Sequence, residues 1–425
     1  MKKIRYGVIG IKGIGKYHVD LAQHQPRVEL AALADIDAAF VNQKSKELGV
    51  RGFTDYRDML DAGIVDAVSI ALPHHLHREV GLTCLKAGLH IFIEKPLANR
   101  VSEAEAMIAS AQAKNLKICV GHQYRTHRSS RVLKELIESG AIGKIMRVLW
   151  SWVEFRPESY YTRDIWRTTW QYSGGGILMN QVSHDLDLLC WLAGKPVQVS
   201  ALVANQLHAA EIEDIACANI LFANGALASF QATINQPRGY SVRQIAGDKG
   251  VIVMQDVKSL TSDQDDQILL GTYEDALLTK AENLAGDHDQ PGISWQFCKL
   301  PNSSRNDQTI VKKLARRFDK MILSRLTRSE TVLQRAEWLK LSEPVGHYAL
   351  MNSFIQAILW DKEPLVSGES ALPVIELINA ILLSAIRKKT VDLPLDRAEY
   401  DHLFEELCSG KVQTPRFRCN DGSHC

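Results

Sequence analysis

The chain has 425 residues, which is long for one domain and suits two, and its 46% hydrophobic and 23% charged residues are typical of a globular protein. The formal net charge of +1 gives no overall field that favours nucleic acid or an anionic membrane. Met1-Lys2-Lys3 runs directly into a strand-like segment, so no secretory leader is expected, and no apolar stretch looks long enough to span a bilayer. The eight cysteines include no CxxC pair, which predicts reduced thiols in the cytoplasm.

The first segment of the chain predicts a strand, a glycine turn and a helix. Residues 4–9 have the pattern of a buried strand, and GIKGIG follows at residues 10–15. In this context a glycine motif indicates dinucleotide binding, because Gly10 suits a tight turn, Gly15 permits close helix–sheet packing, and the helix N-terminus faces a pyrophosphate. Lys12 stands where the middle glycine of GxGxxG is usual, and a lysine beside phosphates is electrostatically reasonable. A plain strand–turn–helix without a ligand is the alternative.

A second predicted strand, residues 28–34, ends at Asp35. A carboxylate at this place binds both ribose hydroxyls of NAD and repels a 2′-phosphate. The sequence therefore favours NAD over NADP, although an ordinary aspartate at a strand end is the alternative.

Three further strands alternate with helical patterns through the first third of the chain. The predicted strands are residues 65–72, 91–93 and 116–120, and the predicted helices are residues 38–48, 78–87 and 103–114. Such alternation predicts a right-handed, mostly parallel sheet, in which Lys95 of Glu94-Lys95-Pro96 shares an edge with the glycine turn. A partly desolvated lysine there can lower its pKa and take part in proton chemistry. The nearby His74 and His75 are adjacent in sequence and lack the partners of a metal site, so no metal is expected.

A second candidate site follows the glycine turn at residues 174–176. Residues 177–192 predict one helix, in which Asn180 and His184 lie four apart on the same face. Histidine is suited to proton transfer near neutral pH, although a lone helical histidine is more often structural.

The remainder of the chain predicts a sheet, an insertion and two helices. The predicted strands are residues 197–203, 216–222, 226–234, 242–246 and 250–254, and the predicted late helices are residues 347–359 and 370–386. The first half of the stretch from 256 to 343 is polar and predicts a long loop. Residues 311–328 predict a basic amphipathic helix, which binds an anionic partner or membrane surface, or packs by its apolar stripe with a solvated basic face.

The ordered motifs resemble the Gfo/Idh/MocA oxidoreductases, the family of glucose–fructose oxidoreductase and inositol dehydrogenase. The matching pieces are Gly10 to His18, Ala34-Asp35, Pro73-x-x-x-His77, Ala87-Gly88, Glu94-Lys95-Pro96, Gly140-x-Ile142-Gly143, Trp166-Arg167 and Gly174 to His184. The resemblance covers about residues 1–255 and 345–390. It implies an α/β Rossmann dinucleotide-binding domain at residues 1–125. It also implies an α+β domain with a large, mostly antiparallel sheet at residues 126–425, which serves substrate binding and oligomerisation, to a dimer or tetramer, and has an insertion at about 256–343.

The resemblance further implies NAD(P)-dependent hydride transfer at a carbinol or carbonyl carbon of a sugar, cyclitol or nucleotide sugar. It implies a cis bond before Pro96. The cofactor site that it implies, together with the glycine motif, comprises Gly10, Lys12, Gly13, Ile14, Gly15, Asp35, Pro73, His77, Glu94 and Lys95.

The chemistry expected from these residues is acid–base assisted oxidation. His184 acts as the general base, and Lys95 hydrogen-bonds the reacting oxygen. Asn180, at a position that is commonly Asp in the resembling enzymes, orients the substrate or His184, while Trp166 and Arg167 line the sugar pocket. A redox-neutral glycosidase that uses NAD transiently, and a non-catalytic dinucleotide sensor, are the alternatives. The presence of both Lys95 and His184 argues against the sensor.

Overall fold

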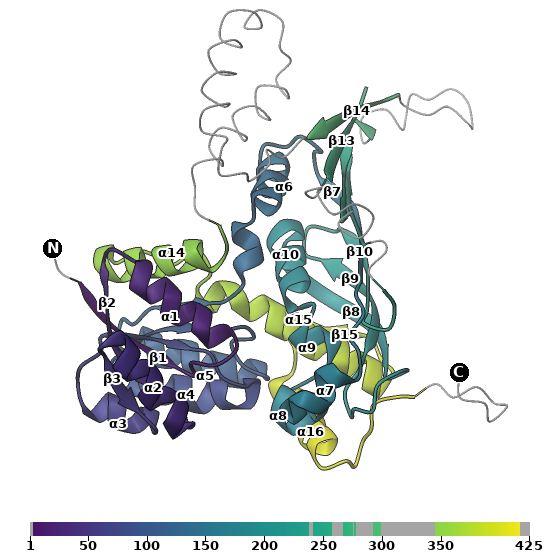
Figure 1. The fold of residues 1–425 in the computed structure, drawn as a ribbon. Helices are drawn as coiled ribbons and strands as arrows, with labels where there is room; N and C mark the ends of the chain where they lie inside the picture. Colours follow the sequence, from purple (N-terminus) through teal and green to yellow (C-terminus); the bar gives the residue numbers. More distant parts are fainter. Residues whose placement is uncertain are drawn as a thin grey trace, which may run out of the picture.

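The computed structural model describes residues 3–237, 241–256, 267–274, 276–277, 292–298 and 345–416. These residues form two units, one around a six-stranded sheet and one around a nine-stranded sheet. Figure 1 shows the two units side by side, with the larger sheet seen edge-on and its helices facing the smaller unit. The predicted basic helix at residues 311–328 lies outside the described residues.

The first unit is a Rossmann domain, as predicted. Its strands are β1 (Ile4–Ile9), β2 (Val28–Ala34), β3 (Arg51–Phe53), β4 (Ala67–Ile70), β5 (His90–Ile93) and β6 (Ile118–Val120). Its helices are α1 (Ile14–His24), α2 (Ala38–Leu48), α3 (Tyr56–Asp61), α4 (His77–Lys86) and α5 (Val101–Gln112). All strand pairs are parallel, in the order β3-β2-β1-β4-β5-β6. The order reverses between β1 and β4, which is the point where such sheets bind ligands.

The sequence prediction missed β3 and α3 because neither has a long apolar run. Arg51–Phe53 is short and nowhere fully buried, whereas Ile91, Phe92 and Ile93 of the predicted strand are completely buried. Burial on both faces is what gives central parallel strands a readable apolar sequence.

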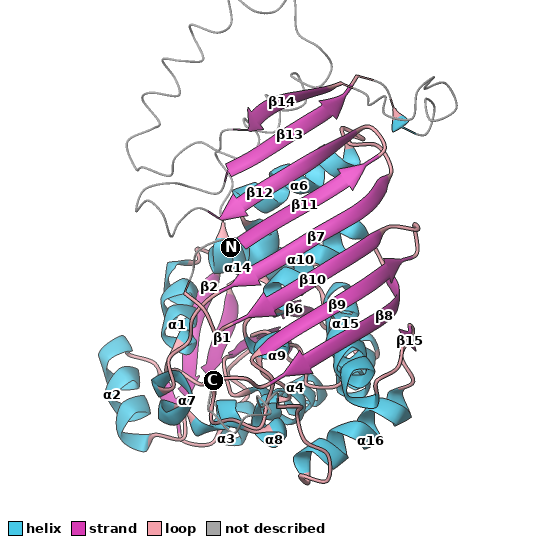
Figure 2. Ribbon diagram, turned by 90° about the vertical axis from the view of Figure 1, so that its right-hand side faces the viewer, coloured by secondary structure: helices cyan, strands magenta, loops and turns pink. Residues whose placement is uncertain are grey.

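The second unit contains a mostly antiparallel sheet, as the family resemblance implied. Its strands are β7 (Ile145–Val153), β8 (Pro196–Ala204), β9 (Ile215–Phe222), β10 (Leu227–Thr233), β11 (Ser241–Gly247), β12 (Gly250–Asp256), β13 (Gln267–Tyr273), β14 (Ile293–Cys298) and β15 (Val391–Asp392). The order is β14-β13-β12-β11-β7-β10-β9-β8-β15, and β7 and β10 form its parallel pair. In β9 and β10 buried residues alternate with exposed ones, and Figure 2 shows the outer face of the sheet free of described helices.

Two sequence predictions for this unit were wrong. Residues 267–273 and 293–298 were expected to be loop, but they form β13 and β14, which extend the sheet from the edge of β12. The helix predicted over residues 177–192 is interrupted: α9 (Ile177–Asn180) is separated from α10 (Ser183–Ala193), because the Val182 amide donates to the Ile177 carbonyl instead of continuing the regular ladder.

The remaining helices of the second unit cover the inner face of its sheet or close the gap between the units. They are α6 (Arg128–Glu138), α7 (Ser159–Arg163), α8 (Trp170–Ser173), α15 (Gly368–Arg387) and α16 (Arg397–Cys408), with the short 3₁₀ helices η2 (Gln123–Thr126) and η3 (Ile165–Thr168). A further 3₁₀ helix, η1 (His74–Leu76), belongs to the Rossmann unit, between β4 and α4. By length and composition α15 could cross a bilayer, contrary to the expectation from the sequence, but 72% of its apolar window is buried inside the protein. We therefore describe α15 as a core helix.

Helix α14 (Gly346–Trp360) returns the chain to the Rossmann unit. Its Phe354 ring lies 6.0 Å from the ring of Phe92 in β5 and 6.5 Å from that of Tyr6 in β1. The Val120 amide then donates to the Val366 carbonyl at 2.9 Å, beyond the last strand of the smaller sheet. The two units are thus joined by packing as well as by the chain.

Candidate active site

The glycine turn after β1 has the geometry that a dinucleotide requires. Gly10 has φ +79°, and a Cβ atom on it would overlap the Ala71 carbonyl oxygen. A Cβ atom on Gly15 would overlap the Gly10 carbonyl oxygen. Only glycine fits at both positions, so the chain can turn tightly here and bring helix α1 close to the sheet.

Asp35 fixes the same turn from the end of β2. Its carboxylate accepts the Ile11 amide at 3.0 Å and the Asp37 amide at 3.0 Å. The Lys12 Nζ pairs with Asp37 at 2.5 Å, at the exposed rim of the turn. Lys12, which stands in place of the usual middle glycine, is thus held beside the turn and places a positive charge there.

A pocket of about 470 Å³ opens at the point where the strand order reverses. Its lining includes the predicted residues Gly10, Lys12, Asp35 and Pro73. A glycine turn without side chains, a helix N-terminus and a carboxylate at one pocket fit a dinucleotide with its pyrophosphate at the helix and its ribose at Asp35. The predicted Ile14 is partly exposed at the start of α1, beside this turn.

His77 and Glu94, two of the predicted cofactor-binding residues, are buried. The His77 ring nitrogens lie 2.6 Å from the Pro96 carbonyl and 2.9 Å from the Leu72 carbonyl. Both ring nitrogens are thus occupied by backbone groups at the ends of two neighbouring strands. The structure therefore gives His77 a supporting position behind the site.

Glu94 joins the Rossmann strands to the returning helix α14. Its Oε1 accepts from His18 Nε2 at 2.8 Å and from His347 Nε2 at 2.9 Å, while His18 Nδ1 lies 2.9 Å from the Ser69 hydroxyl. Within the described residues, His18, Glu94 and His347 have spacing that could hold a metal ion, but their nitrogens and shared oxygen already bond to one another. Burial acts to raise the pKa of Glu94, and the two imidazole hydrogen bonds outweigh it and hold this pKa well below its usual range.

We expect Glu94→Gln to lower the free energy of unfolding by about 1.5–3 kcal/mol at pH 7, since hydrogen bonds to a charged group become hydrogen bonds to an amide. A carboxyl group with a depressed pKa stabilises the fold above its unfolded pKa of about 4.3, and this contribution is lost as pH falls further. Urea unfolding from pH 7 to about pH 2 should therefore show a difference between the two proteins that is constant down to about pH 4 and shrinks as pH falls further. Glu79→Gln, in an exposed pair with Arg57, is the control. A difference that does not change with pH would contradict an ionised Glu94.

Lys95 reaches from the end of β5 into the second unit. The peptide bond between Lys95 and Pro96 is cis, as the family resemblance implied, and Lys95 Nζ donates to the Asn180 carbonyl at 2.5 Å. Burial lowers the pKa of Lys95 to about 8; Glu94 opposes this change, and Arg167 and Arg156 add to it. At neutral pH the amine is therefore mostly protonated and can donate to an oxygen.

His184 lies in the first turn of α10, where the charge of Lys95 acts on it. Its ring stacks on Tyr124 at 4.4 Å and meets the His122 ring edge-on at 5.5 Å. Burial, together with the charges of Lys95 and His122, lowers the pKa of His184 well below its usual value. A neutral imidazole that retains 7% exposure is suited to accept a proton.

Asn180 contacts Lys95 through its backbone. Because the helix breaks after it, the argument from a shared helix face does not hold, and among the described residues no hydrogen bond joins its side chain to His184. Its backbone carbonyl receives Lys95 instead. The half-buried side chain is left as a candidate for substrate contact.

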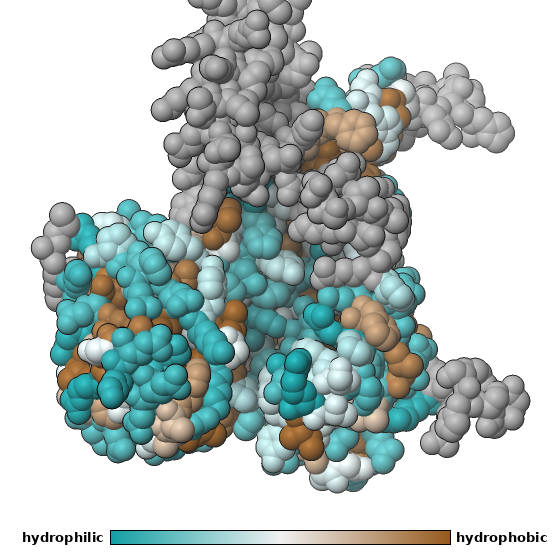
Figure 3. Space-filling model, in the orientation of Figure 1, coloured by the Kyte–Doolittle hydropathy of each residue, from teal (hydrophilic) through white to brown (hydrophobic). Residues whose placement is uncertain are grey.

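Trp166 and Arg167, the predicted substrate residues, lie near His74 and Lys95 of the Rossmann unit. The Trp166 ring lies 4.9 Å from the His74 ring of the Rossmann unit, and the Arg167 Cζ lies 4.8 Å from the Trp166 ring. Figure 3 shows the cleft between the two units, which their hydrophilic surfaces flank in its lower part. An aromatic ring beside charged groups is a common environment for a sugar.

The sequence prediction missed His122, Tyr124 and Arg156. One signal was present: His122 follows the predicted strand at residues 116–120, so it had to lie at the same sheet edge as Lys95. No comparable signal existed for Arg156, which follows an antiparallel-sheet strand far from any glycine motif.

Comparison with known proteins gives matches over both units. Residues 4–122 match the oxidoreductase family with an NAD-binding Rossmann fold, and residues 130–253 match the GFO/IDH/MocA C-terminal domain. Myo-inositol 2-dehydrogenase of Thermotoga maritima is 28% identical over 319 residues, which are 70% of this chain and 92% of that protein. A 1-carboxy-3-chloro-3,4-dihydroxycyclohexa-1,5-diene dehydrogenase of Comamonas testosteroni is 26% identical over 401 residues, 88% of this chain and 94% of its own.

A solved structure agrees with these sequence matches. The WlbA dehydrogenase from Chromobacterium violaceum, in complex with NADH and UDP-GlcNAcA, superimposes with a TM-score of 0.72 and 26% identity, over 93% of this chain and 97% of that one.

Proposed function

Because the chain belongs to the Gfo/Idh/MocA oxidoreductase family, we propose that Lys95 and His184 serve an NAD-dependent hydride transfer at a carbinol or carbonyl carbon of a sugar, cyclitol or nucleotide sugar. The observation that supports this most is that Lys95 Nζ donates to the Asn180 carbonyl at the sheet edge that holds the dinucleotide pocket. The charge of Lys95 there also acts on His184, whose pKa is lowered well below its usual value. The names of the relatives, which include a myo-inositol and a dihydroxycyclohexadiene dehydrogenase, support a hydroxylated ring as substrate.

The residues of this chain divide the proton chemistry between them. When bound, NAD would accept the hydride in oxidation, and NADH would supply it in reduction. In oxidation the neutral His184 takes the hydroxyl proton, and the protonated Lys95 donates a hydrogen bond to the oxygen as negative charge develops there. Trp166 offers a ring face to the apolar face of the substrate. In reduction, protonated His184 returns the proton to the same oxygen.

Asp35 supports a preference for NAD over NADP. Its carboxylate lines the dinucleotide pocket while it holds the Ile11 and Asp37 amides, so it cannot move away from a 2′-phosphate without releasing the glycine turn. A 2′-phosphate would therefore meet a fixed negative charge.

Self-association and location complete the proposal. The outer face of the nine-stranded sheet exposes large apolar residues, with Leu202 66% and Phe297 76% exposed, which supports a dimer or tetramer formed through this face.

The six cysteines among the described residues are free, which supports a cytoplasmic protein. We retain residues 1–125 as the cofactor domain and residues 126–425 as the substrate and oligomerisation domain, with α14 packed back onto the former.

A substrate screen with both cofactors tests the proposed function. The purified protein is incubated with NAD or NADP and with myo-inositol, hexoses, uronic acids and UDP-sugars, and absorbance of the reduced cofactor is followed. We expect reduction of NAD in preference to NADP by at least one compound. Cleavage of a glycoside without net NADH would instead support the redox-neutral glycosidase, and tight NAD binding without either reaction would support the sensor.

A further inference from the structure

Two arginines outside the predicted proton-transfer pair lie close to Lys95. Arg156 follows strand β7, and Arg167 belongs to η3. The Cζ atoms of Arg156 and Arg167 lie 5.3 Å and 4.6 Å from the ring of Tyr160, so one aromatic ring is shared by both guanidinium groups. Both positive charges also act on Lys95, where they disfavour the protonated amine. Three cations therefore meet at one side of the cleft.

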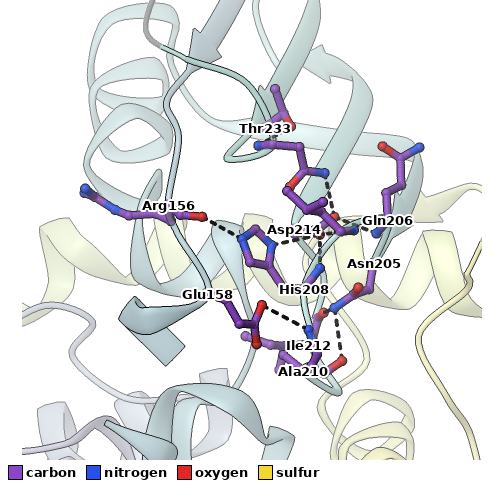
Figure 4. Close-up of polar contacts among 12 residues, drawn as sticks. Arg156, Glu158, Asn205, Gln206, His208, Ala210, Ile212, Asp214 and Thr233 are labelled. Carbon is purple, nitrogen blue, oxygen red and sulfur yellow. Dashed lines mark hydrogen bonds and ion pairs between the residues drawn. The ribbon is translucent and has the colours of Figure 1, made fainter. Parts of the chain in front are cut away.

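Arg156 is held firmly through its backbone. Its amide donates to the Ile234 carbonyl at 3.0 Å, and its carbonyl accepts from His208 Nε2 at 2.7 Å. His208 Nδ1 in turn lies 3.0 Å from Asp214, whose carboxylate also accepts from neighbouring backbone amides. Figure 4 shows this network, with the carbonyl of Arg156 toward His208 and its side chain directed away from it. The guanidinium is thus presented by a fixed piece of backbone.

Gln181 connects this arginine to the reacting lysine. Arg156 Nη2 donates to Gln181 Oε1 at 3.1 Å, and Gln181 Nε2 donates to the Tyr160 hydroxyl at 2.8 Å. Gln181 directly follows Asn180, whose carbonyl receives Lys95. A substrate whose oxygen lies at Lys95 would therefore have its neighbouring substituents near the two guanidinium groups.

Both guanidinium groups keep donors without a protein acceptor. Arg156 pairs with Glu154 at 3.0 Å, and Arg167 pairs with Asp164, in each case through Nη1. The Nε atoms of both arginines are buried and lack a hydrogen-bond partner among the described residues. A buried donor without an acceptor costs about 1–3 kcal/mol, and adjacent like charges add to the cost. An oxyanion at this place would remove both penalties.

We propose that Arg156 and Arg167 form an anion subsite that binds a carboxylate or phosphate group of the substrate, so that the enzyme prefers an acidic sugar or cyclitol derivative over its neutral counterpart. The proposal rests on the dehydrogenase function above and specifies its substrate class. Paired arginines suit this task because guanidinium groups present planar, fixed donors that match the oxygens of carboxylate and phosphate. A bound anion would also favour the protonated form of Lys95, the form that donates to the reacting oxygen.

Calorimetry on the NADH-loaded protein tests the subsite directly. The probes are D-glucose, D-glucuronate and D-glucose 6-phosphate, which share a ring and differ in charge. We expect one of the two anions to bind at least about tenfold more tightly than glucose, and Arg156→Gln and Arg167→Gln each to abolish most of that preference. The stronger of the two anions identifies carboxylate or phosphate as the recognised group. Arg163→Gln, an exposed arginine of α7, is the matched control and should keep the preference.

The outcomes separate this proposal from the proposed function. Equal binding of glucose and both anions, or an anion preference that survives in both arginine variants, would overturn the subsite even if neutral sugars reduce NAD. Failure of the whole substrate screen to reduce NAD would overturn the dehydrogenase, while a preference for an anion that is lost in both variants would still support the subsite. Folding of each variant is checked by its NADH affinity, since neither arginine lines the dinucleotide pocket.

Discussion

Replacing Lys95 with methionine is expected to lower kcat about 10²–10⁴-fold while NAD affinity stays nearly unchanged. The lysine donates to the reacting oxygen in our mechanism, and methionine keeps much of its length without a proton or a charge. Lys95 lies at the end of β5 and does not line the dinucleotide pocket, so cofactor binding should not depend on it. The measurement is steady-state turnover with the substrate found in the screen, together with NAD titration.

Lys114→Met is the matched control for this prediction, because Lys114 also donates to a backbone carbonyl, that of Lys86, but lies on the exposed side of the Rossmann unit. Its kcat should equal that of the unaltered protein. Turnover of the Lys95 variant within a factor of a few of normal would place the chemistry elsewhere.

The pH profile gives a second readout for Lys95. Its pKa of about 8 means that the donating form is lost as pH rises through that value, so kcat/KM should fall on the alkaline side. Lys95→Arg keeps its charge to much higher pH, so this variant should be slower but lack that alkaline fall.

His184→Gln is the second change with a large expected effect, a fall of about 10²–10⁴-fold in kcat/KM for oxidation. Glutamine is similar in reach and polarity but cannot take a proton. Because burial lowers the pKa of His184 well below its usual value, the unaltered enzyme should stay active at pH 6, where an ordinary histidine is largely protonated. The acid limb of its pH–rate profile should therefore lie well below 6.5.

His402→Gln, on the exposed surface of α16, controls for the loss of a histidine as such and should leave the profile unchanged. Near-normal oxidation by the His184 variant would mean that another group accepts the proton. A rate in that variant that rises instead of falling through about pH 8 would identify the neutral Lys95 amine as that group. An acid limb near 6.5 in the unaltered protein would contradict the environment that the structure gives His184.

The sequence by itself determined the strands, helices and turns whose signal lies within one short stretch of the chain. Buried parallel strands have continuous apolar runs, and the alternation of these runs with helical patterns was enough to predict a Rossmann sheet with Lys95 at its ligand-binding edge. Gly10 and Gly15 could be assigned their roles because a backbone that excludes a Cβ atom accepts glycine alone. The Gfo/Idh/MocA resemblance added the second, mostly antiparallel sheet and the place of His184.

Only the tertiary structure decided which side chains meet. Glu94 binds His347, which lies 253 residues further along the chain, and Arg156, which follows β7, reaches Gln181, which follows α9. Residues 267–273 form a strand because the edge of β12 offers hydrogen bonds, and residues 293–298 form one on the new edge of β13, although their own sequences predicted loop. The break in the helix after Gly176 also depends on a distant segment. Glu213 accepts the Gly176 and Leu178 amides and so anchors α9 separately from α10. Contacts between distant segments leave no periodic pattern in the sequence. The arginine pair of the anion subsite and the position of Lys95 against the Asn180 carbonyl could therefore be found only from the fold.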